Sequence, residues 1–297
     1  MSQVRVLQRW YVPTIGRRIG AEREGRENYC SGGICGTYAA KFSRGPNGKG
    51  HQSQGGYADK WRGPSHFAVH IPDSLDPSEA APMLCGGVTV YSPLKKYGAG
   101  TTAKEVGVIG IGGLGHFALI FAKAMGANVT AISHSSNKEE DAKKMGASKF
   151  IATGGDAAAA VKGHERTLDL IICSSSASLF SFDHESADHL DDNKMPLEAY
   201  LTLLKPGGHF ILVGVPESKL PAISPAVLIM SNTHLAGSLI GSPKDIAEVL
   251  EFAAKHKVKA WTTKYSLNDV NKAVKSMHAG EARYRYVLVN EKNGGKL

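Results

Sequence analysis

The sequence predicts an α/β fold with a doubly wound parallel sheet, preceded by a region of different character. From Glu105 to Ser242, short apolar runs alternate with helical patterns, a rhythm typical of βαβ units in a parallel sheet. A glycine-rich turn, Gly110-x-Gly112-x-x-Gly115, joins the first of these runs to the first helix. Residues 1–84 contain many Gly, Arg and Pro residues and show little periodicity. These three observations predict one α/β domain and a second, less regular one.

The elements follow in order along the chain. A helix is expected directly after Cys85, and residues 66–72 are strand-like. Strands of the main sheet are expected at 105–112, 128–133, 149–153, 168–174, 209–215 and 234–242. Helices are expected between them at 113–126, 137–146 and 196–208. An amphipathic helix at 243–256, a helical stretch at 267–278 and a closing strand at 283–290 complete the chain. We therefore expect a domain boundary near Cys85 and a return to the first domain after Ser242.

Composition narrows the class of protein. The chain has 297 residues, 42% of them hydrophobic, which suffices for a sizeable core. Its formal net charge of +8 is spread along the sequence without a basic tail, so nucleic acid is not an expected partner. No apolar run approaches the length of a membrane span, and no signal peptide is recognisable. The expected location is the cytoplasm, where the four cysteines would be free thiols or metal ligands.

The glycine motif predicts a dinucleotide site. In a strand-turn-helix context Gly110 permits the tight turn, Gly112 lets the backbone approach a pyrophosphate, and Gly115 lets the helix pack closely on the strand. Gly113 and Leu114 complete the turn, and the helix amino end would hold the phosphates. Glycines also serve ordinary turns, but the context favours a Rossmann-type nucleotide site.

The end of the second strand indicates which dinucleotide is bound. NAD enzymes usually place a carboxylate there to hold the ribose hydroxyls, whereas this chain has Ser133. Ser135, Ser136 and Lys138 follow and suit a 2′-phosphate, so NADP(H) is the expected cofactor. A plain polar connection, with Ser136 or Asn137 as a helix N-cap, is compatible with the same residues.

Several motifs together resemble a known family. They are "ENYC" (27–30), "QGGYAD" (54–59), "CGGVTVYSPL" (85–94), "GVIGIGGLGH" (107–116), "LKPGG" (204–208), "GSLIGS" (237–242) and "RYRYV" (283–287). The chain resembles the cinnamyl alcohol dehydrogenase branch of the zinc-dependent medium-chain alcohol dehydrogenases from about residue 26 to 290. The resemblance implies a Rossmann domain at 85–242 and a partial, mostly β, GroES-like catalytic domain formed by 1–84 and 243–297. It also implies NADPH-dependent, zinc-assisted interconversion of small-molecule aldehydes and alcohols; a homodimer is left open.

The same resemblance implies incomplete zinc sites. Cys85 matches the third protein ligand of the catalytic zinc, and Cys30 matches the last of four cysteines around a structural zinc. The other ligand motifs are not found upstream, and Gly163-His164-Glu165 lies too late in the chain to replace one. Residues 1–25 resemble nothing in the family. We therefore expect a chain that lacks the front of the catalytic domain and holds no well-formed catalytic zinc.

Further positions are candidates for the cofactor site. Thr89 matches a position near the nicotinamide, although a Thr inside a helix is as often a packing residue. Residues at the carboxyl ends of strands, where open α/β sheets bind ligands, are expected to border the cofactor; they are Ser174, Val213, Gly214, Val215, Ser238 and Ile240. Ordinary strand-end packing is the alternative for each of them. Cys173 is expected to be a buried apolar side chain, and residues 178–194 a solvated loop.

Three classes of function fit these residues. The first is an NADP(H)-dependent alcohol dehydrogenase or aldehyde reductase, impaired by the missing ligands. The second is a dinucleotide-binding protein without dehydrogenase activity, because one cysteine cannot fix a zinc ion. The third is a zinc-independent reductase of the quinone reductase kind, which the presence of Cys85 in the zinc family's motif disfavours.

Overall fold

The computed structural model describes residues 41–42, 51–52, 56–58, 65–175, 195–215 and 219–297. The chain divides into two compact units, each described here by itself. The first comprises residues 1–88 and 239–297, and the second residues 89–238. Helix α2 (Gly86–Lys96) runs across the boundary, and Cys85 directly precedes it, as expected.

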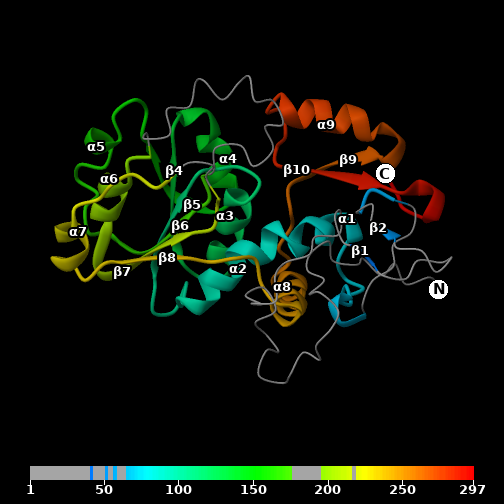
Figure 1. Ribbon diagram of the computed structural model, residues 1–297, viewed down its shortest axis with the longest axis horizontal. Coiled ribbons are helices and arrows are strands. Elements are labelled where there is room, and N and C mark those ends of the chain that lie inside the picture. Colours follow the sequence, from blue (N-terminus) through cyan, green and yellow to red (C-terminus); the bar gives the residue numbers. More distant parts are fainter. Residues whose placement is uncertain (1–40, 43–50, 53–55, 59–64, 176–194, 216–218) are drawn as a thin grey trace. The chain divides into compact units, whose positions relative to one another are not determined.

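The second unit is built on one parallel sheet, which confirms the predicted α/β class (Figure 1). Its strands are β3 (Glu105–Ile109), β4 (Asn128–Ser133), β5 (Ala147–Ala152), β6 (Leu168–Cys173), β7 (Leu204–Leu212) and β8 (His234–Gly237). They lie in the order β5-β4-β3-β6-β7-β8, and every neighbouring pair is parallel. The order reverses between β3 and β6. In doubly wound sheets such a switch point is where ligands bind, at the carboxyl ends of the strands.

Helices connect these strands. They are α3 (Gly115–Ala124), the short 3-10 turn η5 (Ser136–Lys138) with α4 (Glu139–Lys144), α5 (Ala157–Ala160), α6 (Leu197–Thr202) and α7 (Pro225–Ile229). Helix α3 packs on β3, β4 and β6, while α4 packs on β5 and α6 on β7. The central strands are apolar on both faces because helices cover them, and Val108, Ile132 and Ile171 are fully or almost fully buried. One core cluster gathers around Phe210 and Leu201.

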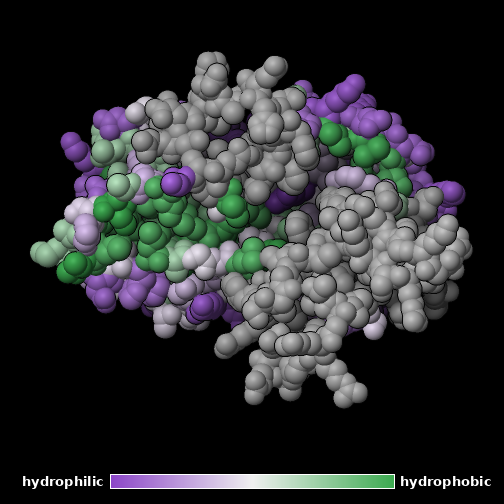
Figure 2. Space-filling view, in the orientation of Figure 1, coloured by the Kyte–Doolittle hydropathy of each residue, from purple (hydrophilic) through white to green (hydrophobic). Residues whose placement is uncertain are grey.

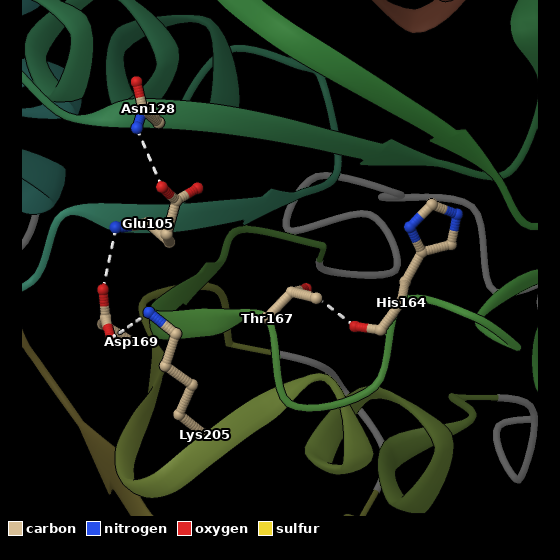
Figure 3. Close-up of polar contacts among 6 residues, drawn as sticks. All are labelled: Glu105, Asn128, His164, Thr167, Asp169 and Lys205. Carbon is tan, nitrogen blue, oxygen red and sulfur yellow. Dashed lines mark hydrogen bonds and ion pairs between the residues drawn. The ribbon is translucent and has the colours of Figure 1, made fainter.

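Polar contacts tie the amino ends of the strands together (Figure 3). Asp169 of β6 accepts hydrogen bonds from Lys205 Nζ at 2.8 Å and from the backbone N–H of Glu105 at 2.9 Å. The Glu105 carboxylate in turn accepts a 2.8 Å bond from Asn128 Nδ2. Burial alone would raise the pKa of Asp169, but these donors and the Lys205 charge outweigh it and lower the pKa. The network joins β3, β4, β6 and β7 at the edge opposite the glycine turn.

The first unit has smaller elements in its described parts. They are β1 (Lys41–Phe42), β2 (His51–Gln52), α1 (Pro77–Ala80), the 3-10 turns η3 (Ser65–Phe67) and η4 (Ala81–Leu84), α8 (Pro243–His256), β9 (Thr262–Ser266), η8 (Leu267–Asp269), α9 (Val270–His278), β10 (Arg285–Val289) and η9 (Glu291–Asn293). Strands β9 and β10 form a parallel pair, and β1 and β2 an antiparallel one. Helix α8 begins with a capping box, in which Ser242 and Asp245 satisfy each other's backbone N–H.

The structure corrects three local expectations. Residues 66–72 do not form a strand, because the 3-10 turn η3 and irregular backbone occupy the segment. The helix expected at 196–208 ends at Thr202, and Leu204–Gly208 already belong to β7, with Pro206, Gly207 and Gly208 disfavouring a helix. Neither Ser136 nor Asn137 caps α4; Lys138 occupies that position without a side-chain cap bond.

Apolar side chains reach the surface of the second unit along α7 and β8, where Figure 2 shows a hydrophobic area. Ile229 and Met230, at the end of α7, are 75% and 80% exposed. Among the described helices, none combines the length and apolar character that a membrane crossing requires.

Candidate functional site

Five of the candidate positions lie at, or directly after, the ends of strands that are in register. Ile109 pairs with Ile132 and with Cys173, Cys173 with Leu212, and Leu212 with Gly237. The next residue on each strand is therefore at the same carboxyl edge of the sheet; these residues are Gly110, Ser133, Ser174, Val213 and Ser238. These residues come from separate segments of the sequence, and the strand register places them at the same carboxyl edge of the sheet.

The glycine turn follows β3 at the switch point. Gly110 has a φ of +83°, a conformation that side chains other than glycine rarely adopt. A Cβ on Gly115 would lie 1.8 Å from the Gly110 carbonyl oxygen, so only glycine permits α3 to start this close to the strand. A Cβ on Gly112 would meet nothing within 4 Å. Space therefore exists beside the Gly112 backbone, as a bound pyrophosphate requires.

Ser174 braces the turn from the neighbouring strand. Its Oγ donates to the carbonyl oxygens of Gly110 at 2.9 Å and of Ile109 at 3.1 Å. Its backbone N–H donates to the Ile109 carbonyl at 2.9 Å. Ser174, which follows β6, is therefore hydrogen-bonded to the turn that follows β3 on the other side of the switch point. A serine after a buried strand is the only signal in the sequence that hints at this contact.

Lys138 links the second strand's connection to the same turn. Its Nζ donates to the Ile111 carbonyl oxygen at 2.8 Å, which places the ammonium group beside the glycine motif. Ser135 Oγ donates to Asn137 Oδ1 at 2.7 Å in the same connection. The Ser133 carbonyl accepts the backbone N–H of Thr153 at 2.8 Å. The segment after β4 therefore places a cation on the turn, and Ser133 stands where NAD enzymes have a carboxylate.

The remaining strand-end candidates differ in their surroundings. The Gly214 N–H donates to the Cys173 carbonyl at 3.3 Å, and a Cβ on Gly214 would approach the Ser175 carbonyl oxygen to 3.0 Å. The Val215 side chain is 58% exposed. The Ser238 N–H donates to the Leu212 carbonyl at 2.9 Å and continues the sheet. Ile240, in the first unit, has a φ of +47°, a strained value for a β-branched residue.

Cys85, which the resemblance assigns to a zinc site, belongs to the first unit. It is half-buried between η4 and α2 and forms no disulfide among the described residues, and Thr89 is buried one turn into α2. The side chain of Arg285, from β10, lies against Gly86: a Cβ there would be 2.6 Å from the guanidinium. Burial lowers the pKa of the Arg285 guanidinium, and the proximity of Cys85 acts in the opposite direction. Sequence reasoning missed Arg285, whose only signal was its place in the "RYRYV" motif.

The described residues do not fit a catalytic zinc ion. A working site needs about three protein ligands, and the described part of the chain contains no cluster of three or more His, Cys, Asp or Glu residues. Glu165 accepts the Gly163 N–H, and the His164 carbonyl accepts Thr167 Oγ1 at 2.7 Å, so this segment forms a turn before β6 (Figure 3). Cys30, Cys35 and residues 178–194 lie outside the described residues. Cys173 is buried, as expected, and its pKa is raised by burial.

Comparisons with known proteins agree with this arrangement. A family model described as "Zinc-binding dehydrogenase" matches residues 113–255. "Cinnamyl alcohol dehydrogenase 7" of Oryza sativa subsp. japonica is 38% identical over 275 residues, which cover 90% of this chain and 66% of the rice protein. The chain thus spans about two thirds of the length of the curated relatives that it matches.

Two solved structures share both fold and sequence. A cinnamyl alcohol dehydrogenase of Sorghum bicolor aligns with a TM-score of 0.77 and 33% identity, covering 97% of this chain and 74% of the sorghum chain. The CAD of Helicobacter pylori, solved in complex with NADP(H), aligns with a TM-score of 0.69 and 30% identity, covering 89% of this chain and 68% of the other. The chain therefore belongs to the zinc-binding medium-chain dehydrogenases, in their cinnamyl alcohol dehydrogenase-like branch.

Proposed function

We propose that this chain binds NADP(H) and derives from enzymes that interconvert small aldehydes and primary alcohols. The observation that carries the proposal is the glycine turn at the switch point, with Lys138 Nζ on the Ile111 carbonyl and a serine at the end of β4. In the direction of reduction, the aldehyde carbon gains a hydride and its oxygen gains a proton. NADPH, when bound, supplies the hydride from C4 of its nicotinamide.

Different residues are proposed to bind the pyrophosphate, the 2′-phosphate and the nicotinamide of the cofactor. The open backbone at Gly112 and the amino end of α3 accept the pyrophosphate, because N–H groups there point outward and the helix dipole favours negative charge. Lys138 and the hydroxyls of Ser133 and Ser135 bind the 2′-phosphate. Within the second unit, the residues after the strand ends, Ser174, Gly214, Val215 and Ser238, border the nicotinamide side.

Catalysis by this chain is expected to be weak or absent. Cys85 is the one residue in the described segments that matches the family's catalytic zinc ligands, and no ligand cluster accompanies it there. Without a fixed Lewis acid the carbonyl is not polarised. A dinucleotide-binding protein without dehydrogenase activity is therefore the second candidate. It is favoured because the described residues contain no group of three or more His, Cys, Asp or Glu side chains that could hold a metal ion.

Cofactor binding is tested by fluorescence titration of the full chain with NADPH and with NADH. We expect tighter binding of NADPH and a selective loss of it in Lys138→Glu, about tenfold or more, because a carboxylate repels the 2′-phosphate. Lys162→Glu is the matched control, since Lys162 is exposed and precedes β6 at the opposite edge of the sheet. Equal affinities for the two cofactors, or equal effects of the two variants, would contradict the proposal.

Metal content and turnover separate the two candidate functions. Elemental analysis of the purified chain and of Cys85→Ala should show no stoichiometric zinc that depends on Cys85. Oxidation of NADPH in the presence of benzaldehyde or cinnamaldehyde should be slow or undetectable. Near-stoichiometric zinc that Cys85→Ala abolishes, together with aldehyde-dependent oxidation of NADPH, would instead establish an active dehydrogenase.

A further inference from the structure

Two histidines stack on each other at the edge of the main sheet. His209 of β7 and His234 of β8 are register partners in parallel strands, so their side chains project from the same face. Their ring centroids are 4.6 Å apart, and the ring planes differ by 13°. The ring of Tyr97 packs on His209 at 4.7 Å, and Lys96 Nζ lies 5.3 Å from the centre of the Tyr97 ring. All four residues belong to the second unit.

We propose that His209 and His234 together bind a divalent transition-metal ion, such as Ni²⁺, Cu²⁺ or Zn²⁺. Imidazole nitrogens are preferred ligands of these ions. In the described part of the chain, the contacts of the two imidazoles are with aromatic rings, so their nitrogens are not engaged by protein groups. The pKa of His209 is lowered by burial and by the proximity of His234, which favours the neutral, ligating form.

Chelation requires one of the stacked rings to turn. Metal–nitrogen distances are about 2.0 to 2.1 Å, so two nitrogens on one ion lie within about 4 Å of each other. The ring centroids are 4.6 Å apart, so the two side chains are near enough to share an ion, but the lone pairs of nearly parallel rings run side by side and converge only when one ring leaves the stack. The terminal torsion of histidine has a broad energy profile, and His234 is exposed, so its ring can turn toward a shared ion. His209 is half-buried against Tyr97 and supplies the fixed partner.

The site is separate from the cofactor turn. His209 and His234 lie in the row of the sheet that contains Val106 and Leu170. Gly237, the last residue of β8, lies three residues further along, which is about 10 Å at the rise of a parallel strand. The pair thus belongs to the body of β7 and β8, not to the carboxyl edge. The proposal does not depend on the proposed cofactor or activity.

Because only His209 and His234 would hold the ion, its affinity should be modest, and the bound ion would link β7 to β8. No third His, Cys, Asp or Glu completes a cluster with the pair among the described residues, so water must fill the other coordination positions. An ion held by both strands would tie the edge strand β8 to β7. Because a ligand that binds only the folded state stabilises it, metal should raise the melting temperature of the chain.

The experiment is a calorimetric titration of the full, chelator-treated chain with Ni²⁺, paired with thermal melts. His234→Gln and His209→Gln should each weaken one binding event about tenfold or more, since even the loss of an outer partner typically has that effect. The double variant should lose little more than either single one, because both remove the same chelate. Each variant should also lose the Ni²⁺-dependent rise in melting temperature.

His278→Gln is the control, because His278 is exposed at the end of α9 in the other unit. It should keep the affinity and the thermal shift of the parent chain. His234 is exposed, so its replacement leaves the core intact, and a metal-free melt equal to the parent's confirms the fold. Unchanged Ni²⁺ affinity in His234→Gln, or an equal loss in His278→Gln, would overturn the proposal.

Discussion

The main sheet of the second unit and the parallel pair β9/β10 of the first unit differ in how completely they are buried. Strands β3 and β6 are buried at four of five and five of six positions. In β9 all five residues are exposed or half-buried, and in β10 only Val289 is buried. Helices cover the main sheet, and the polar network joins its strands at their amino ends. The described strands of the first unit, β9 and β10, are less deeply buried.

The difference bears on the two parts of the proposed site. Residues of β4, of its connection to α4 and of the segment after β6 hold Gly110 and Ile111 of the glycine turn through hydrogen bonds, all within the second unit. Cys85 has Arg285 beside it in the first unit, but no cluster of metal ligands among the described residues. The proposed cofactor binding and the proposed metal-dependent catalysis can therefore be tested by separate substitutions.

The largest expected effect is that of Gly115→Ala. The new Cβ would lie 1.8 Å from the Gly110 carbonyl oxygen, so α3 or the turn must move. We expect a loss of about 3 kcal/mol in the free energy of unfolding, as for severe overpacking, and loss of NADPH binding. Urea denaturation followed by circular dichroism measures the first effect. Gly112→Ala is the matched control, and a Gly115→Ala chain as stable as this control would show that the sheet is more plastic than the contacts indicate.

The next effect concerns the network at the amino edge. Asp169→Asn removes the charge that holds Lys205 and weakens the acceptor of the Glu105 N–H. At neutral pH we expect a loss of about 1.5 kcal/mol in the free energy of unfolding, because hydrogen bonds to charged groups contribute that much. Lys149→Met, which removes an exposed charge on β5, is the control.

The same variant has a defined pH dependence. The pKa of Asp169 is lowered in the folded chain, so its contribution is fully present above the unfolded pKa of about 3.9 and is lost as the pH falls through the folded value. The stability difference between parent and Asp169→Asn should therefore be constant from pH 7 to about 5 and shrink below about 4. A difference that grows on acidification would contradict the assigned cause.

Gly112→Ala should have a smaller effect, on NADPH affinity and not on stability. Gly112→Ala has free space around its Cβ and an ordinary φ, so the stability of the chain should not fall. NADPH affinity should drop about tenfold, or about 1.4 kcal/mol, because the methyl group occupies the space needed by the pyrophosphate. Fluorescence titration measures it. Unchanged NADPH affinity would show that the pyrophosphate does not bind beside Gly112.

Much of the sheet was predictable because its signals are local. Apolar runs predicted β3, β4 and β6 to within a few residues, and the amphipathic pattern predicted α8. The errors lie where local signals compete. The segment 204–208 follows a helical pattern but pairs with β6 through an irregular register, and tertiary pairing decided its conformation. Residues 66–72 have strand-like composition but lack a paired strand in the described structure.

The candidate site was predictable in part for a similar reason. The spacing of Gly110 and Gly115 predicted a tight turn followed by a closely packed helix. The position of Lys138 after β4 predicted a ligand for the 2′-phosphate. The contact of Lys138 with Ile111, the brace from Ser174 and the position of Arg285 join residues 27, 64 and 199 positions apart. No local pattern encodes such contacts, since they arise from strand order and packing. The roles of these residues in cofactor binding remain predictions.

The smallest expected effect lies in the first unit. Lys264 Nζ of β9 lies 3.2 Å from Asp76 Oδ2, joining segments 188 residues apart, but the two side chains are 31% and 46% exposed. Exposed ion pairs contribute little, so Lys264→Met should lower the free energy of unfolding by about 0.5 kcal/mol or less, and less still at high salt. Asp76→Ala should lower it by about 1 kcal/mol, because Asp76 also caps α1 through Ser78. Urea denaturation at low and high salt measures both. A Lys264→Met effect as large as that of Asp169→Asn would show that the first unit depends on long-range polar contacts as strongly as the main sheet does.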